Sequence, residues 1–169
     1  MKTLINISIL FITVTILFSG CGVYSFTGAS IPASAKTVSV QYFPNKAQLV
    51  EPILSPTFTN KLRDIFTVQT TLEMVEANGD IALEGEIVSY KTTPVAIQAD
   101  QTAAMNRLTI VVNVRFVNKL EPEKDFEQKF SQFLEYQSDL PLNSVSAELI
   151  TAINEMLATD IFNKAVVNW

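Results

Sequence analysis

Apolar and polar residues alternate along several stretches of the chain, and this period of two is typical of β-strands. The clearest stretch runs from Leu108 to Phe116, where every second residue is apolar. Thr109, Val111 and Asn113 lie on its other face. Five strands are predicted in all, over residues 37–43, 68–74, 81–87, 108–116 and 126–136. Asn78-Gly79 is a strong turn signal, so we expect the second and third strands to form a hairpin.

Two other stretches have the spacing of amphipathic helices. Apolar residues recur at i, i+4, i+7 and i+8 from Phe58 to Phe66, after Ser55-Pro56, which has the form of an N-cap followed by a proline. Near the C-terminus an apolar residue recurs every four positions from Val145 to Ile161. Residues 91–103 predict a long loop, and the charged residues 121–125 predict a turn.

The order strand, helix, four strands, helix predicts an α+β fold. Two helices cannot cover both faces of such a sheet, so we expect a two-layer sandwich. Both helices would pack on one face of a mostly antiparallel four- to five-stranded sheet. The other face, with Val111 and Phe133 among its polar residues, would be left open to water or to a partner.

The first 20 residues have the pattern of a secretory signal peptide. Lys2 precedes an apolar core from Leu4 to Phe18, and the small residues Ser19 and Gly20 follow. The alternative is a transmembrane anchor. An apolar core of about 15 residues is shorter than the roughly 20 that span a bilayer, which favours the signal peptide.

The chain's one cysteine follows this segment directly. The stretch Leu17-Phe18-Ser19-Gly20-Cys21 resembles a bacterial lipobox, in which the thiol carries diacylglycerol and the freed α-amine a further acyl chain. Several acyl chains anchor a protein stably, whereas one is marginal. We therefore expect lipidation at Cys21, a tether over residues 21–36 and a folded domain over 37–169. The alternative is a free, buried cysteine.

Composition excludes several classes of function. The formal charge is −5, which disfavours nucleic acid as a partner. The absence of histidine removes the commonest catalytic base and metal ligand, so we predict no enzyme activity, no metal and no cofactor other than the lipid. Glu84 and Glu86 share one side of a strand and leave a hydrolase as a remote alternative.

Four basic residues flank or lie on the long central strand: Lys91, Arg107, Arg115 and Lys119. Such residues in an acidic envelope protein could meet a lipid phosphate. Arg107 and Arg115 share a strand face but lie about 26 Å apart along it, so they would not form one site unaided. Ordinary surface charge is the alternative interpretation.

A set of segments in fixed order resembles the lipopolysaccharide-assembly lipoprotein family LptE, in its compact branch. The resemblance spans residues 21–169, and no one segment is diagnostic alone. After the lipobox the segments are GVYSFTGASIP, KTVSVQYFPNKA, LSPTFTNKLRDIF, NGD with LEGEIVSY, PVAIQADQTAAMNRLTI, PEKDFEQKFS and DIFNKAVVNW.

The resemblance implies a non-enzymatic role at the bacterial outer membrane. A member of the family would sit as a plug inside the LptD β-barrel, support its assembly, and help to deliver lipopolysaccharide to the outer leaflet. The acyl chains on Cys21 would hold it at the periplasmic leaflet. Lys91 and Arg107 are our candidates, by charge and position, for contact with lipopolysaccharide phosphates. A pilotin-like docking module for another envelope complex is the alternative.

Overall fold

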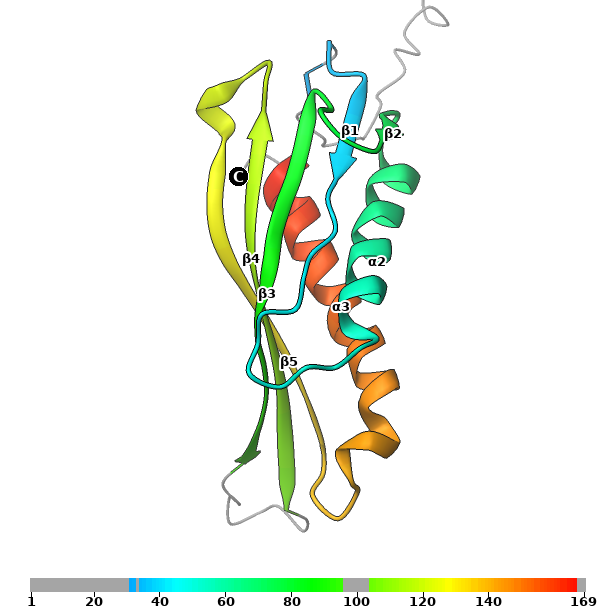
Figure 1. Cartoon of the computed structure of the whole chain (residues 1–169), viewed down its shortest axis with the longest axis vertical. Helices are drawn as coiled ribbons and strands as arrows, with labels where there is room; N and C mark the ends of the chain where they lie inside the picture. Colours follow the sequence, from blue (N-terminus) through cyan, green and yellow to red (C-terminus); the bar gives the residue numbers. More distant parts are fainter. Residues whose placement is uncertain (1–30, 33, 96–103, 167–169) are drawn as a thin grey trace, which may run out of the picture.

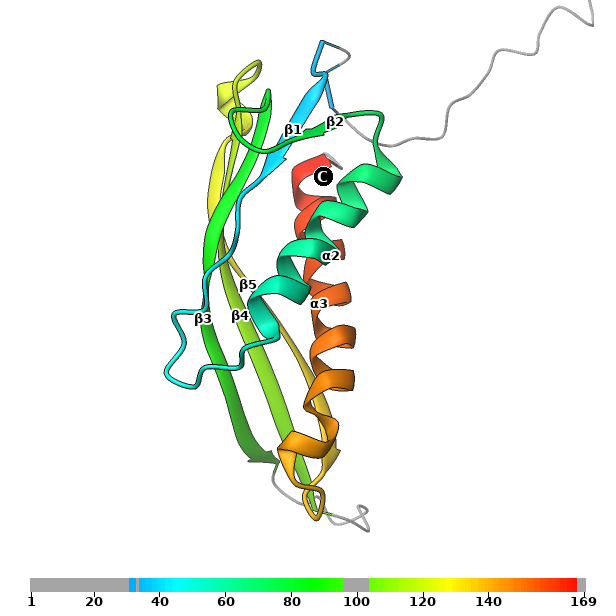
Figure 2. The same cartoon turned by 45° about the vertical axis from the view of Figure 1, so that its right-hand side comes forward.

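Two helices lie on one face of a five-stranded sheet, and Figures 1 and 2 show these two layers. The computed structural model describes residues 31–32, 34–95 and 104–166. The strands are β1 (Thr37–Val40), β2 (Glu73–Val75), β3 (Ile81–Val95), β4 (Met105–Asn118) and β5 (Phe126–Gln137). The helices are α2 (Leu54–Gln69), the short 3₁₀ helix η1 (Pro122–Lys124) and α3 (Leu142–Val166). The predicted two-layer α+β sandwich is confirmed.

The strand order in the sheet is β2-β1-β3-β4-β5. β1 pairs in parallel with both β2 and β3, over three residues each. The long pairs β3–β4 and β4–β5 are antiparallel, so most of the sheet's ladder is antiparallel, as predicted. β3, β4 and β5 extend well beyond the short strands, and α3 follows them over their length while α2 covers only one half (Figure 1).

The predicted hairpin between residues 68–74 and 81–87 is wrong. The turn at Asn78 exists, with Asn78 at a φ of 60°, but β1 lies between β2 and β3. The Asp80 carboxylate explains this placement, because it accepts hydrogen bonds from the backbone N–H groups of Lys36 and Thr37 at 2.9 and 3.0 Å. These bonds attach the start of β1 to the turn that begins β3.

Several predicted boundaries also shift. α2 begins at Leu54 with Ile53 at its N-cap, so Ser55 lies inside the first turn and is not the cap. α2 ends at Gln69, which places the predicted strand residue Val68 in the helix. Lys91 to Val95 continue β3, although the sequence predicted a loop from residue 91. The predicted turn at 121–125 is confirmed and contains η1.

The core lies between the sheet and the helices. The inward residues of β4, from Leu108 to Phe116, are almost completely buried, as the alternation predicted. Two aromatic pairs lie in this core. Phe43, beyond the end of β1, meets Phe58 of α2 edge to face at 5.2 Å, and Phe66 of α2 meets Phe162 of α3 at the same distance, which joins the two helices. Such pairs add to the stabilisation from burial alone.

The face of the sheet opposite the helices carries mainly polar and charged side chains. Val111 is partly buried there and Phe133 is 45 % exposed, in agreement with the predicted open face. Within the described ranges, no helix is both long and apolar enough to cross a membrane.

Candidate functional site

The open face of β3, β4 and β5 is ordered in rows of cross-strand neighbours. Lys91 pairs with Thr109, which pairs with Phe133. In the next row Thr93 pairs with Arg107, which pairs with Glu135. Lys91 and Arg107 are therefore diagonal neighbours, and such positions lie about 7–8 Å apart. The structure brings these two predicted contact residues together on one surface.

Arg107 is held in place by its neighbours on β5. Its guanidinium lies 2.6 Å from the Glu135 carboxylate (Nη2 to Oε1) and 4.1 Å from the centre of the Phe133 ring. A carboxylate and an aromatic face together orient a guanidinium without neutralising its remaining donors. The Arg107 side chain keeps 39 % of its exposure, so it remains accessible to a ligand.

Lys91 is exposed and makes no ion pair with any described residue. The other basic candidates lie elsewhere. Arg115 pairs with Glu84 at 3.1 Å, further along the open face. Lys119 donates to the backbone oxygen of Asn78 at 2.8 Å, at the turn before β3. The four basic residues thus form no single cluster, as the spacing of Arg107 and Arg115 predicted.

The carboxylates Glu84 and Glu86 also lie on the open face of β3. Glu84 pairs with Arg115 at 3.1 Å, and Glu86 lies opposite Asn113 of β4 on the same sheet surface. Across the part of the chain that the structure describes, no group of three or more acidic or sulfur ligands is placed to hold a metal ion.

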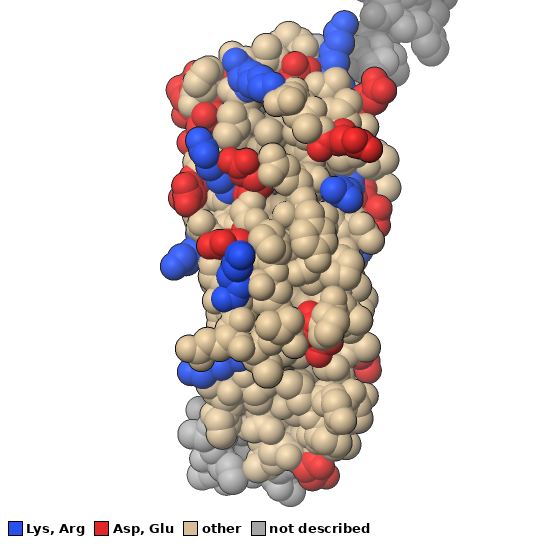
Figure 3. Space-filling model, viewed as in Figure 1, with Lys and Arg blue, Asp and Glu red and all other residues tan. Residues whose placement is uncertain are grey.

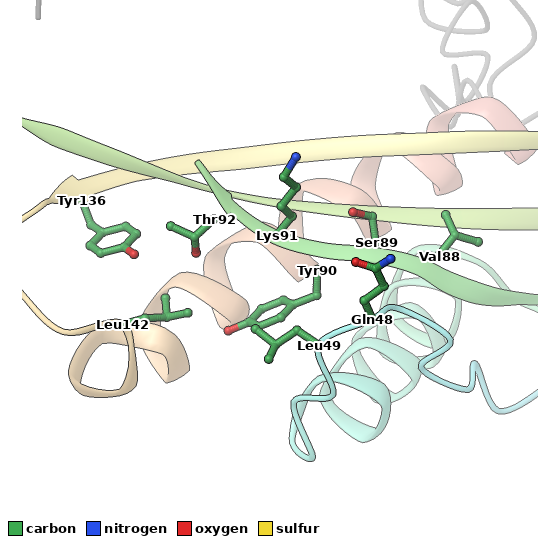
Figure 4. Close-up of a pocket in the computed structure, with 9 residues that line it drawn as sticks. All are labelled: Gln48, Leu49, Val88, Ser89, Tyr90, Lys91, Thr92, Tyr136 and Leu142. Atoms are coloured by element: carbon green, nitrogen blue, oxygen red, sulfur yellow. The ribbon is translucent and has the colours of Figure 1, made fainter. Parts of the chain in front are cut away.

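A hollow of about 580 Å³ opens on the helix side of β3, beyond the region that α2 covers. Figure 4 shows Tyr90 and Lys91 leaving β3 on opposite sides, so that Tyr90 faces the hollow and Lys91 the open face. Its lining comes from the loop before α2, from β3, from β5 and from the start of α3. The lining residues are Gln48, Leu49, Val88, Ser89, Tyr90, Lys91, Thr92, Tyr136 and Leu142.

Two hydroxyl groups beside this hollow are buried without a hydrogen bond. Tyr90 is only 4 % exposed, and neither its hydroxyl nor that of Thr92 has a partner in the described structure. Burial, and to a lesser extent the nearby groups of Glu51 and Tyr136, raise the pKa of the Tyr90 hydroxyl to about 12. Buried polar groups normally have hydrogen-bond partners, so two unpaired hydroxyls side by side indicate a surface that binds another molecule.

Sequence reasoning missed the hollow because it predicted a loop from residue 91. The residues of β3 that face the helices alternate strictly up to Ile87. The next two are Tyr90 and Thr92, one position later than strict alternation would place them. The register shifts between Ile87 and Ser89, and this β-bulge interrupts the strict alternation. A search that allowed one extra residue at Val88 would have extended the strand through Thr92.

Comparison with known proteins identifies the family. The sequence profile of LptE, described as lipopolysaccharide-assembly, matches residues 35–165. No curated protein matches the chain. Cys21 lies outside both the matched range and the described residues.

Solved structures with a similar arrangement include bacterial lipoproteins. A minor lipoprotein from Acinetobacter baumannii aligns with a TM-score of 0.52 and 13 % identity, over 77 % of this chain and 91 % of that one. A protein named as a homologue of the neuraminyllactose-binding hemagglutinin, from Helicobacter pylori, aligns with a TM-score of 0.50 and 9 % identity, over 83 % and 88 %. Rare lipoprotein B from Shewanella oneidensis aligns with a TM-score of 0.42 and 13 % identity, over 74 % and 89 %.

At such low identity the first two structures establish a shared fold and no more. The family profile, in contrast, covers most of the chain, from just before β1 into the last turn of α3. It includes every strand and both long helices described above. The chain therefore belongs to the LptE family of lipopolysaccharide-assembly proteins.

Proposed function

We propose that this chain is an outer-membrane lipoprotein subunit of the lipopolysaccharide transport complex, where it plugs an LptD-type β-barrel and supports its assembly. The match to the LptE family over residues 35–165 carries this proposal. The family acts in lipopolysaccharide assembly and is not enzymatic, and the aligned Acinetobacter protein is itself a lipoprotein.

The shape of the domain supports a role inside a larger protein. It is elongated, with a helical layer on one side and an open sheet face of mixed polarity on the other (Figure 2). The open face carries cross-strand rows in which an acidic side chain pairs with a basic one, such as Glu84 with Arg115 and Glu135 with Arg107. A surface of this kind suits the polar inner wall of a barrel, whose strands point alternate residues into the lumen.

Anchoring through Cys21 is the second part of the proposal. Lipid chains on this cysteine would hold the domain at the periplasmic side of the outer membrane. Cys21→Ser removes the thiol that accepts diacylglycerol, so we expect the uncleaved precursor to accumulate and radiolabelled palmitate to be absent from the protein. Labelling that persists in Cys21→Ser would contradict lipidation at this residue.

The partner is tested by recovery of the intact complex. A tag after Trp169, extraction in mild detergent and mass spectrometry should identify a large outer-membrane β-barrel at one-to-one stoichiometry. Depletion of the chain should then reduce lipopolysaccharide at the cell surface. Recovery without a barrel, together with normal lipopolysaccharide export after depletion, would reject the proposal in favour of a pilotin-like docking module.

Direct contact with lipopolysaccharide is proposed for Lys91 and Arg107. Charge reversal of both (Lys91→Glu with Arg107→Glu) should weaken binding of purified lipopolysaccharide, because phosphate recognition depends on paired cationic donors. The sheet offers a matched control in Arg115 and Lys129, which are also diagonal neighbours on the open face. The control double reversal should bind normally, and equal loss in both variants would refute a localised site.

A further inference from the structure

β3 has a neighbour along its whole length on one edge only. β4 pairs with it from Ile81 to Val95. On its other edge β1 pairs with Ile81 to Leu83, and Asn45 bridges to Ile87. From Val88 onward, no described strand pairs with that edge. A free edge leaves backbone donors and acceptors unpaired, and such an edge is a template for an added strand.

The register shows which backbone groups face this edge. The N–H of Ile87 donates to the Pro44 oxygen at 2.9 Å, and the oxygen of Ile87 accepts from the N–H of Lys46 at 2.8 Å, so both groups point away from β4. Groups along a strand alternate in direction, and Val88 is the extra residue of the bulge. Tyr90 and Thr92 therefore direct their N–H and C=O groups to the free edge.

The usable part of this edge has the length of an ordinary strand. It begins at the bulge residue Val88 and ends at Thr93, because Pro94 has no N–H to donate. Strands of five or six residues are the commonest in proteins. We call Val88–Thr93 the β3 free edge.

Unpaired side-chain groups gather at the same place. Four buried side-chain polar atoms have neither a hydrogen bond nor an ion pair in the described structure, once Glu121 Oε2, which lies 2.8 Å from Lys124 Nζ, is set aside. Three of them lie along or next to the β3 free edge: Asn45 Nδ2, the Tyr90 hydroxyl and Thr92 Oγ1. Buried polar groups in proteins normally have hydrogen-bond partners, so the concentration of unpaired groups here points to a missing binding partner.

The surroundings of the β3 free edge are apolar and accessible. Leu49 and Val50, in the loop beside it, are 52 % and 66 % exposed. Figure 4 shows the Tyr90 ring with Leu49 beside it and Leu142 near its hydroxyl, at the hollow of about 580 Å³. Figure 3 shows few charged side chains over this half of the molecule, whereas many cover the other half. A partner's side chain could enter by displacing the exposed Leu49.

We infer that the β3 free edge accepts an extended segment of the partner protein as an additional strand. Main-chain hydrogen bonds to Tyr90 and Thr92 hold the segment, as in other cases of strand addition. On the helix side, one of its side chains enters the hollow and hydrogen-bonds the two hydroxyls. On the open face, an acidic side chain lies near Lys91, the charged residue of the hollow's lining. The inference rests on the proposed function for the source of the segment, the barrel protein.

Three other possibilities fit the observations less well. A second copy pairing symmetrically through this edge would bring one Lys91 close to the other, and like charges at that spacing repel. A lipid acyl chain could fill the hollow but would leave the backbone groups of Tyr90 and Thr92 unpaired. The outer edge of β5 is longer, but none of the buried side-chain atoms that lack a partner in the described structure belongs to β5.

Hydrogen exchange on the purified complex and on the free chain is the first test. Amides in peptides covering 88–93 should exchange at least about tenfold more slowly in the complex, because they gain strand partners. Peptides covering the outer strand β5 serve as the internal control, and their protection should change less. Equal exchange at 88–93 in both samples would overturn the inference. So would protection of 88–93 in the free chain that rises with its concentration, which would indicate a second copy.

Variants at two positions separate the side-chain and backbone contributions. Tyr90→Phe and Thr92→Val each remove one unpaired hydroxyl, and each should weaken recovery of the barrel by about 2- to 10-fold, the effect of one net hydrogen bond. Thr92→Pro also removes an edge N–H and should weaken it further. Circular dichroism establishes that each variant is folded. Unchanged recovery with folded Tyr90→Phe and Thr92→Val would overturn the inference.

These outcomes are distinct from failure of the proposed function. If the unmodified chain recovers no barrel, the proposed function fails before any variant is compared. If it recovers the barrel with an unchanged β3 free edge, the function stands and strand addition is rejected. If lipopolysaccharide alone protects residues 88–93, the hollow binds lipid, and strand addition is again rejected.

Discussion

Gly85 is the position where the smallest substitution should cost most. It lies on β3 opposite Val114 of β4, with a φ of +156°, which residues with a side chain rarely adopt. A Cβ added there would lie 2.0 Å from the backbone oxygen of Asn113 and 2.8 Å from Cε1 of Phe43. Gly85→Ala therefore meets a rigid main chain on one side and a core aromatic ring on the other.

The size of the effect follows from these two contacts. Real Cβ atoms essentially never come within 3.0 Å of a heavy atom outside their own and the adjacent residues, so β3 and β4 would have to separate by about 1 Å. That movement disturbs a ladder whose normal strand spacing is about 4.8 Å. Backbone strain contributes about 1–3 kcal/mol and overpacking about 1–3 kcal/mol. Alanine also reduces the conformational entropy of the unfolded chain, which offsets about 0.4–1 kcal/mol of the loss in stability. We expect a net loss of about 1–6 kcal/mol in the free energy of unfolding.

Urea denaturation followed by circular dichroism measures this loss. With a slope of about 2 kcal/mol per molar urea, the middle of the usual range, the midpoint should fall by roughly 0.5–3 M. Glu86→Ala, one residue further along on the open face, is the control and should change stability by less than about 0.5 kcal/mol. A midpoint for Gly85→Ala within the error of the unmodified chain would refute the argument from close approach.

Three further predictions concern single contacts. Hydrogen bonds from Lys36 and Thr37 lower the pKa of the Asp80 carboxyl, so its stabilisation is complete above the ordinary value of 3.8 and disappears as the pH falls through the lowered pKa. Asp80→Asn should be less stable at neutral pH and approach the unmodified chain below that pKa; a constant gap in unfolding experiments would contradict this. Asn154 is 1 % exposed and donates to Thr57 at 3.0 Å, but its own side-chain oxygen has no partner in the described structure. Asn154→Leu should therefore leave the free energy of unfolding unchanged or raise it by up to about 1 kcal/mol. A clear loss of stability in urea denaturation would contradict this. Arg107→Ala should change stability by less than about 1 kcal/mol because its ion pair is solvated, and thermal melting of the variant checks this.

The sequence predicted the layers well, because period and burial have a direct physical link. The β4 alternation placed Leu108 through Phe116 in the core, and the helical spacing placed Phe58 and Leu62 there. The order of the strands in the sheet was harder to predict, because Asn78-Gly79 indicates a turn but not which strands pair with each other. The bonds from Lys36 and Thr37 to Asp80 connect positions 44 and 43 residues apart, which no local pattern shows.

The candidate site was predicted only in part, for the same reason. Lys91 and Arg107 were chosen by charge, and their shared surface depends on the β3–β4 register, which local periodicity does not determine. The Glu135 and Phe133 contacts of Arg107 come from a third strand. The hollow depends on where α2 begins relative to β3, a strand whose length was underestimated.

The position of β1 has a consequence for the order in which the molecule folds. Proteins are synthesised from the N-terminus, yet both strand partners of β1 come later in the chain, and Thr37 meets Asp80 only across 43 residues. Closing so long a loop is entropically costly, whereas β3, β4 and β5 follow one another along the chain and each pairs with the next. We expect the nucleus to form within residues 81–166 and β1 to insert last. Until then Val38 and Val40, both fully enclosed in the finished sheet, remain available to chaperones.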